Sequence, residues 1–151
     1  MDGDAEADRA RRDGIQRPRP RGDAEEDRRG SPRIRSRQSL WNAGSSAEGL
    51  SLYEPAKSEF AEILNISTDA DDCGQHEKCF TYESTLAYDE ASNPKAFDLK
   101  LAVKGTYRNR AGRIVAVPAA PFVLRFADGK YAPVLTTAAM RAAWEAMQSP
   151  W

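Results

Sequence analysis

Segment 69–79 concentrates the side chains that most often bind metals or move protons in proteins. It holds four acidic residues, both cysteines of the chain and its single histidine. A calcium loop of the EF-hand type needs oxygen ligands at alternate positions, a glycine at position six and a glutamate at position twelve. Counted from Asp69, Gly74 fits this pattern, but Cys73 and Phe80 occupy the fifth and twelfth positions. The segment therefore lacks the bidentate ligand that such a calcium site requires.

Sulfur chemistry gives two further interpretations of the same segment. Cys73, His76 and Cys79 lie three residues apart and would offer sulfur, nitrogen and sulfur to a zinc ion. Structural zinc sites usually take two ligand pairs from separate segments, and the chain has no second pair, so we predict no metal site. A disulfide between Cys73 and Cys79 would instead close a small loop and contribute roughly 2 kcal/mol. Two free thiols are the alternative to this bridge, and the sequence leaves both open.

The remaining motifs give little support to catalysis. His76 lies in a polar loop, where an exposed imidazole is expected rather than a general base paired with a cysteine. The chain contains no G-x-S-x-G nucleophile elbow and no glycine-rich phosphate loop. We therefore predict no catalytic residue and no cofactor, and we favour a protein that is not an enzyme.

Three tyrosines are candidates for lining a pocket. Tyr82, Tyr88 and Tyr107 fall on the apolar face of predicted strands, and each hydroxyl needs a hydrogen-bond partner or contact with water. They could line a cavity between a sheet and helices. The alternative is a position at the rim of the core.

Helical periodicity appears in two parts of the chain. Apolar residues from Leu52 to Leu64 recur at the spacing of one helix face, which predicts a helix over 50–64. A second helix is predicted after Thr136 or Thr137, either of which can serve as its N-cap. The apolar stripe of this second helix consists of Met140, Ala143, Trp144 and Met147.

Alternating apolar and polar residues predict four strands between these helices. The strands cover 79–88, 97–108, 114–126 and 131–135. Prolines at 118, 121 and 133 cannot donate to a ladder of hydrogen bonds, so they indicate sheet edges or a break in the third strand.

The predicted order is one helix, four antiparallel strands and one helix. One face of the predicted meander carries nearly all the large apolar side chains, so both helices are expected to pack on that face in a two-layer α+β domain. In outline this order resembles cystatin-like folds, a resemblance that implies architecture only. We assign residues 46–151 to this single α+β domain.

Residues 1–45 differ from the rest of the chain in composition. The first 40 residues hold 11 arginines, no lysine, 9 acidic residues and no aromatic residue. Such a segment buries too little apolar surface to offset the entropy of ordering it, so we predict a disordered, Arg-rich tail over 1–45. Its arginines at 17–21 and 33–37 could contact the phosphates of a nucleic acid. The acidic residues between them and the net charge of −1 for the whole chain disfavour this association.

Localisation remains open at the level of the sequence. No apolar stretch follows Met1 as in a secretory signal, and no apolar run is long enough to span a bilayer, so we expect no membrane association. We expect a cytoplasmic protein by default, and an exported one if Cys73 and Cys79 are bridged.

Three functions follow from these expectations. The leading one is a small non-enzymatic binding or protein-interaction module, whose partner is an unknown protein or small ligand, or a second copy bound through a sheet edge. The second is a small enzyme or ligand-binding protein with a cavity between sheet and helices, which would use a carboxylate from Asp98 or Glu83, or the hydroxyls of Tyr82 and Tyr107. The third is nucleic-acid association through the Arg-rich tail.

Overall fold

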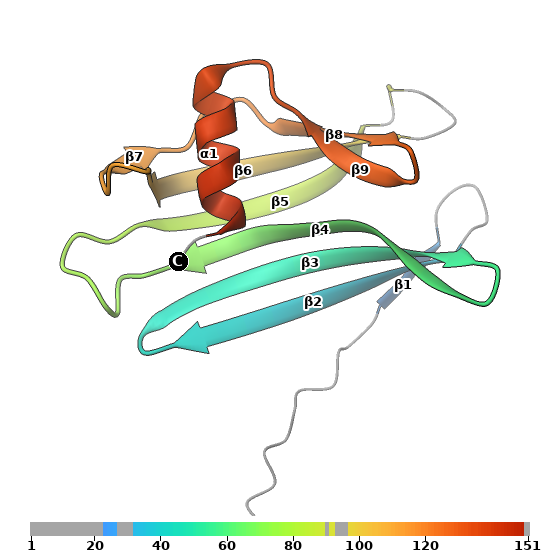
Figure 1. The fold of residues 1–151 in the computed structure, drawn as a ribbon, viewed down its shortest axis with the longest axis horizontal. Coiled ribbons are helices and arrows are strands. Elements are labelled where there is room, and N and C mark those ends of the chain that lie inside the picture. Colours follow the sequence, from blue (N-terminus) through green and yellow to red (C-terminus); the bar gives the residue numbers. More distant parts are fainter. Residues whose placement is uncertain (1–22, 27–31, 90, 93–96, 150–151) are drawn as a thin grey trace, which may run out of the picture.

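The computed structural model describes residues 23–26, 32–89, 91–92 and 97–149. These residues form nine strands and one helix (Figure 1). The elements are β1 (Asp23–Glu26), β2 (Pro32–Asn42), β3 (Ser45–Ala56), β4 (Glu59–Asp71), β5 (Thr81–Asp89), β6 (Asp98–Arg108), β7 (Ile114–Ala116), β8 (Phe122–Ala127), β9 (Lys130–Val134) and α1 (Ala138–Gln148). The strands pair antiparallel in the order β1-β2-β3-β4-β5-β6-β8-β9, and β7 pairs with β6.

β2, β3 and β4 form one long ribbon of two hairpins. Ala43 and Gly44 connect β2 to β3 with φ angles of 45° and 95°, as in the two-residue turn whose twist matches that of a hairpin. Lys57, with a φ of 31°, lies in the turn between β3 and β4. Register shifts beside Gly49 and Tyr53 increase the twist of the β3–β4 pair. Figure 1 shows the three strands curving together.

β5, β6, β8 and β9 form a second group of strands. β5 pairs with β6 over nearly its whole length, and β8 pairs with both β6 and β9. The β8–β9 turn contains Asp128 and Gly129, with φ angles of 52° and 80°, and an Asp-Gly pair is a strong hairpin signal. These strands correspond to the four that the alternating pattern predicts, with the third divided into β7 and β8 at its prolines.

A short junction joins the two groups. β4 pairs with β5 only through Ala70 opposite Tyr82 and Asp71 opposite Thr81. Gly105, with a φ of 124°, approaches β5 so closely that a Cβ at this position would come within 2.8 Å of the Tyr82 Cα. Glycine therefore permits the close contact of β6 with β5 beside the junction. Beyond the junction β4 and β5 diverge (Figure 1).

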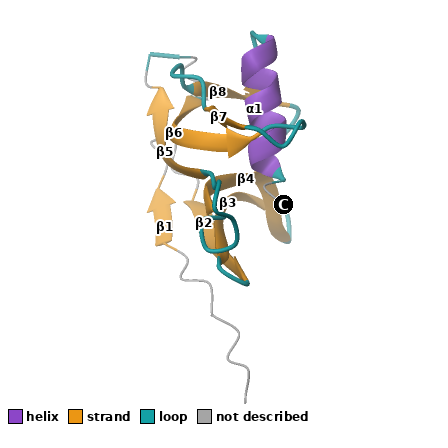
Figure 2. Ribbon diagram, turned by 90° about the vertical axis from the view of Figure 1, so that its left-hand side faces the viewer, coloured by secondary structure: helices purple, strands orange, loops and turns teal. Residues whose placement is uncertain are grey.

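α1 packs against the strands on one side of the sheet (Figure 2). Its N-cap is Thr137, whose side chain accepts the N–H of Met140 at 3.1 Å. The buried residues of the helix are Met140, Ala143 and Met147, and the helix contacts both β4 and β6. The structure thus confirms the predicted C-terminal helix and shows that it bridges the two groups of strands.

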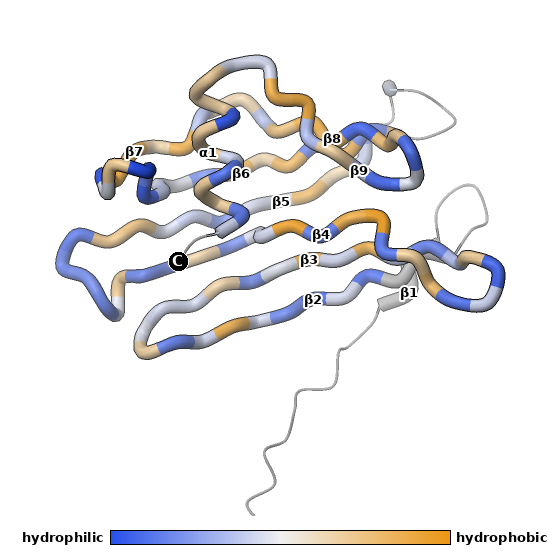
Figure 3. The backbone as a smooth tube through the Cα atoms, viewed as in Figure 1, coloured by the Kyte–Doolittle hydropathy of each residue, from blue (hydrophilic) through white to orange (hydrophobic). Residues whose placement is uncertain are grey.

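The core lies mainly between α1 and the second group of strands. Leu99, Leu101, Phe122 and Leu124 have no exposed surface. In Figure 3 β4 carries a long apolar stretch, whereas the β3–β4 and β8–β9 turns are largely hydrophilic. Alternation along each strand thus directs apolar side chains inward and charged ones such as Lys100 outward.

The helix predicted over 50–64 is wrong, because these residues form the β3–β4 hairpin. Leu52 and Leu64, whose spacing fits one helix face, are direct partners across this hairpin and are both buried. Phe60, which the predicted helix would bury, is 52% exposed near the hairpin turn. Pairing between distant residues has therefore overridden the local periodicity.

The predicted fold class is wrong for the same reason. The described residues form a many-stranded antiparallel sheet with one short C-terminal helix, not a four-stranded meander with a helix on either side of it in the chain. The resemblance to cystatin-like folds fails with the first helix. β2 falls within the predicted tail, and its pairing with β3 gives it a place in the sheet. Residues 1–22 and 27–31 of that tail lie outside the described residues.

Candidate functional site

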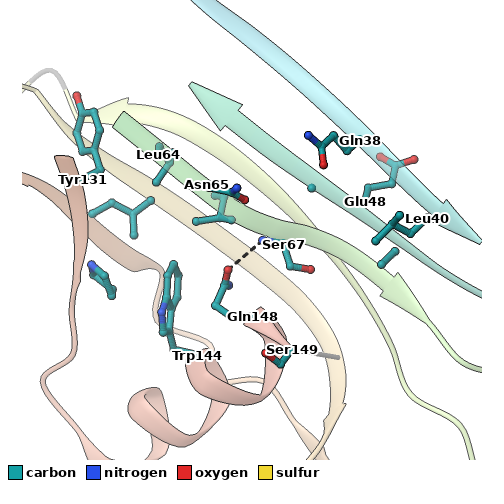
Figure 4. Close-up of a pocket in the computed structure, with 15 residues that line it drawn as sticks. Gln38, Leu40, Glu48, Leu64, Asn65, Ser67, Tyr131, Trp144, Gln148 and Ser149 are labelled. Carbon is teal, nitrogen blue, oxygen red and sulfur yellow. Dashed lines mark hydrogen bonds between the residues drawn. The ribbon is translucent and has the colours of Figure 1, made fainter. Parts of the chain in front are cut away.

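The C-terminal end of α1 lies against β4 where β4 no longer pairs with β5. Gln148 Oε1 accepts the backbone N–H of Ser67 at 3.0 Å (Figure 4). The Tyr82 hydroxyl donates to the backbone carbonyl of Met147 at 2.9 Å. The helix thereby supplies the hydrogen-bond partner that β5 would supply if the two strands stayed paired.

A groove of about 640 Å³ lies beside this contact. The inner face of β2, β3 and β4 forms one side, and α1 with β8 and β9 forms the other (Figure 4). Its larger apolar lining residues are Leu40, Leu64, Ile66, Leu124, Tyr131 and Trp144. Its polar lining includes Gln38, Asn65, Ser67 and Gln148. This size and this mixture of side chains are typical of sites that bind a small molecule.

The Tyr82 hydroxyl is the centre of a small hydrogen-bond network. It lies 2.9 Å from Ser67 Oγ, and its own proton goes to the Met147 carbonyl, so Ser67 donates to Tyr82. Burial raises the pKa of Tyr82 to about 12, so the phenol keeps its proton at neutral pH. Tyr82 therefore fixes the end of α1 to the sheet.

The three tyrosines proposed from the sequence do not line this groove. Tyr82 is buried at the junction, and Tyr107 is buried where β6 pairs with β7. Tyr88 is half-buried near the end of β5, opposite Leu99. The aromatic lining comes instead from Tyr131 and Trp144, whose ring centre lies 5.4 Å from that of Phe122.

Cys73 and Cys79 are joined by a disulfide, which decides between the two states that the sequence leaves open. Asp72, at the start of this loop, accepts the N–H of Phe80 through Oδ1 at 2.7 Å. Its other oxygen, Oδ2, lies 2.8 Å from Arg108 Nη2, and the Asp72 side chain is only 6% exposed. Because a buried carboxylate needs such partners, this ion pair fixes the loop to β6.

The disulfide loop also contacts the turn between β2 and β3 and holds it in place. Gln75 Nε2 donates to the backbone carbonyl of Asn42 at 2.7 Å. Gly44 and Gly74 pack so closely that a Cβ on Gly44 would come within 2.8 Å of the Gly74 carbonyl oxygen. One end of β2 is therefore fixed in place by contacts far along the chain.

The side chains of this loop that could bind a metal ion are already engaged in other contacts. Asp72 and the two sulfur atoms lie within 4.8 Å of one another, but the sulfurs are bonded together and offer no thiolate. Asp72 is already bound to Arg108 and Phe80. His76 is exposed, with Nε2 3.9 Å from Asp72 Oδ2, so it has no cysteine thiol to activate.

The carboxylates considered for catalysis lie outside the groove. Asp98 is buried and binds Arg125, with Oδ2 3.2 Å from Arg125 Nη2. Glu83 is exposed on β5.

The strand β2 carries two of the large exposed apolar side chains of the described residues. Leu40 is 61% exposed and Trp41 is 80% exposed. β1 pairs only with residues 32–35. Within the described part of the chain, residues 36–42 therefore pair with β3 on one side and have no strand on the other. We call residues 36–42 the free edge.

Backbone groups of the free edge alternate in direction. Asn42 and Ser45 flank a two-residue turn, so they form the first hydrogen-bonded pair of the hairpin, and every second residue of β2 is bonded in the same way. The residues between these have N–H and C=O groups that point away from β3: Arg37, Ser39 and Trp41. The free edge thus offers unpaired backbone donors and acceptors to another strand.

The other two sheet edges expected from proline positions lie elsewhere. Residues 118–121 fall between β7 and β8, outside any strand. β9, which contains Pro133, is the last strand in the pairing order, as proline at an edge indicates. β9 also lies close to β4, so this edge of the sheet has another strand beside it.

No protein-family model, curated protein or solved structure matches this chain. Among the described residues, none of the helical structure is long and apolar enough to cross a membrane. Function must therefore be inferred from the groove, the disulfide loop and the free edge.

Sequence reasoning gives Leu40 and Trp41 no role, because it assigns them to the tail or its boundary. A usable signal is the Ala43-Gly44 pair, since glycine at the second position suits a two-residue hairpin turn. No local sequence pattern marks the groove, because its lining residues come from elements far apart in the chain: β2, β3, β4, β8, β9 and α1.

Proposed function

We propose that this chain is a non-enzymatic protein-interaction module that binds extended segments through the free edge of β2. The observation that carries the proposal is the coincidence of an open strand edge with exposed Leu40 and Trp41. Strand addition draws affinity from backbone hydrogen bonds and specificity from alternate side chains. The free edge supplies both, since its outward backbone groups are flanked by Leu40 on the groove side and Trp41 on the opposite face.

The anchoring of the β2–β3 turn supports this role. A flexible edge would lose conformational entropy when a partner binds, which lowers affinity. Here the disulfide loop contacts the turn through Gln75 and Gly74, and the loop itself is fixed to β6 through Asp72 and Arg108. The free edge is therefore held in the conformation that a partner strand requires.

Selection of linear peptides displayed on phage tests the proposal, because a random library samples many extended segments at once. We expect peptides that bind the wild-type protein to lose binding to Ser39→Pro. Proline removes the outward N–H at the centre of the free edge and leaves the bonded positions of β2 intact. Ser39→Ala keeps this N–H and is the matched control, so it should bind the peptides as wild type does.

Urea unfolding of both variants shows whether each is folded before binding is compared. Selection of no peptide from the library would contradict the proposal. So would peptides that bind wild type and a folded Ser39→Pro variant equally well.

The groove supports a second candidate function, the binding of a small apolar molecule. Its lining combines Ile66 and Trp144 with the amide of Gln148. An occupant would contact Trp144, so we expect a bound molecule to shift the indole N–H resonance of this residue in an NMR screen. Ile66→Trp, which fills the groove, should abolish the shift; a shift that persists in this variant would place the ligand elsewhere.

The disulfide supports a proposal about compartment. Disulfides persist in oxidising environments and are rare where glutathione keeps thiols reduced. We therefore propose that the protein works in an oxidising compartment. Alkylation of the protein isolated from its source, without reductant, should leave Cys73 and Cys79 unmodified; two alkylated cysteines would contradict this.

A further inference from the structure

We propose that the free edge pairs with itself, so that two copies of this chain form a dimer in which residues 36–42 lie antiparallel to residues 36–42 of the second copy. This inference rests on the proposed function and names its partner. The same segment serves both copies, as a two-fold symmetric interface requires.

The backbone selects one register for this pairing. In an antiparallel pair, residues that exchange two hydrogen bonds must both direct their N–H and C=O groups toward the partner strand. A two-fold axis at Ser39 places Ser39 opposite Ser39 of the second copy, and Arg37 opposite Trp41 of the second copy. All outward residues of the free edge are then paired. Any other two-fold register pairs at least one of them with the β2–β3 turn or with the part of β2 that β1 covers.

Side chains in this register are complementary. Arg37 and Trp41 lie on the same face of β2, since they are four residues apart on a strand. Across the two-fold axis the guanidinium of Arg37 therefore reaches the indole of Trp41 in the second copy, twice per dimer. Trp41 is 80% exposed, and Arg37 forms no ion pair among the described residues. Both groups are thus available for this contact.

The groove face gives a second complementary pair. Gln38 and Leu40 lie on the same face and both line the groove. The register places Gln38 opposite Leu40 of the second copy, so the stem of Gln38 covers part of a side chain that is 61% exposed in one copy. A register centred on Arg37 would instead place two arginines opposite each other, which like charges disfavour.

Sedimentation equilibrium of the full chain over a wide range of concentration tests the dimer. We expect a reversible monomer–dimer equilibrium for wild type and Ser39→Ala, and a monomer for Ser39→Pro. Trp41→Arg places arginine opposite arginine twice and should raise the dimer dissociation constant about tenfold or more. The double variant Arg37→Trp/Trp41→Arg restores both mixed pairs and should recover the wild-type constant.

Cross-linking tests the register directly. Ser39 of the two copies forms a hydrogen-bonded pair with Cα atoms roughly 5.5 Å apart, a distance that a disulfide spans. Ser39→Cys should therefore form a 39–39 cross-link under mild oxidation, identified by peptide mass. Ser58→Cys, in the exposed turn after β3, is the matched control for random collision and should cross-link much more slowly.

The outcomes separate this inference from the proposed function. A monomer at every concentration, with Ser39→Cys no faster than Ser58→Cys, overturns the dimer. Peptides selected on phage that still require the Ser39 N–H would then leave the proposed function standing. A dimer that Ser39→Pro does not weaken also overturns the inference, because its contact would lie elsewhere.

Discussion

Two regions of the molecule differ in how they bury apolar side chains. The first region is α1 with β5, β6, β8 and β9, and the second is the ribbon of β2, β3 and β4. Nearly all the largest fully buried side chains belong to the first region: Leu99, Leu101, Phe122, Leu124 and Met147, with Ile63 of β4 as the exception. All the large exposed apolar side chains of the described residues belong to the ribbon: Leu40, Trp41 and Phe60. The ribbon also contributes buried residues such as Leu52 and Ile66 to the core, but among the described residues it alone exposes large apolar side chains.

A few contacts join the ribbon to the rest of the molecule and stabilise it. The junction with β5, the contact between Gln148 and Ser67, and the disulfide loop are among the places where the ribbon is held. A binding surface on the ribbon can therefore keep exposed apolar residues without weakening the core. The comparison predicts that substitutions in the two regions will differ in how much they lower the free energy of unfolding and in how much of the molecule they affect.

Leu101→Ala should have the largest effect. Leu101 is fully buried, so the loss of its side chain should lower the free energy of unfolding by about 2–5 kcal/mol. Leu40→Ala removes the same atoms from a side chain that is 61% exposed and should cost less than about 0.5 kcal/mol. Urea unfolding measures both, and similar losses would remove the contrast between the regions.

Removal of the disulfide should come next. Cys73→Ser/Cys79→Ser lifts the constraint on a short loop and should lower the free energy of unfolding by roughly 2 kcal/mol. Because this loop contacts the β2–β3 turn, the amide of Ser45 should exchange faster with solvent, whereas that of Leu101 should keep its relative protection. Uniform acceleration across both amides would mean that the loop stabilises the fold as a whole and does not specifically hold β2.

Tyr82→Phe tests the attachment of α1 to the ribbon. Loss of the hydrogen bonds to Met147 and Ser67 should cost about 1 kcal/mol at neutral pH. Burial raises the pKa of Tyr82 from 10.0 to about 12, so the unfolded chain loses this proton first as pH rises. The stability that Tyr82 contributes is therefore complete below pH 10.0 and falls as pH rises toward about 12.

Unfolding measured across this alkaline range should show a decline in wild type that Tyr82→Phe reduces. An equal decline in both proteins would assign it to other groups. The conservative variant keeps the aromatic ring, so the difference reports on the hydroxyl alone.

Ala43→Asn should have a small effect of the opposite sign and stabilise the protein. Ala43 has a φ of 45°, a conformation that costs alanine roughly 1 kcal/mol and that asparagine tolerates better. We expect a gain of about 0.5–1 kcal/mol in urea unfolding. Gly44→Ala is the opposing control and should destabilise, since its Cβ would come within 2.8 Å of the Gly74 carbonyl oxygen. No gain in Ala43→Asn would mean that this turn contributes little to the ribbon.

The sequence predicts the region around α1 better than the ribbon, and the reason is the range of the interactions. β5, β6 and β8 each show their own alternation, and α1 shows its own stripe and N-cap, so local patterns are sufficient there. In the ribbon, Leu52 and Leu64 satisfy helical spacing and cross-strand pairing equally well. Only the position of one strand beside the other decides between these structures.

The same contrast between local patterns and long-range contacts applies to the candidate site. The spacing of Cys73 and Cys79 makes a bridge possible, but only their separation in space decides that it forms. Tyr82 is expected to face a core or pocket, and its bond to Met147 depends on a helix 65 residues away in the chain. The free edge is defined by which residues of β2 have a second partner strand in the described part of the chain, which is a property of strand pairing and not of residue type.

The central claim is that the free edge of β2 is the docking surface, and amide hydrogen exchange of its residues tests this most directly. At a concentration too low for the free edge to pair with a second copy, a bound phage-selected peptide should protect the outward amides of Arg37, Ser39 and Trp41. The amides of Gln38 and Leu40, already bonded to β3, should change little. Binding that leaves Arg37, Ser39 and Trp41 exchanging as fast as in the free protein would contradict the account.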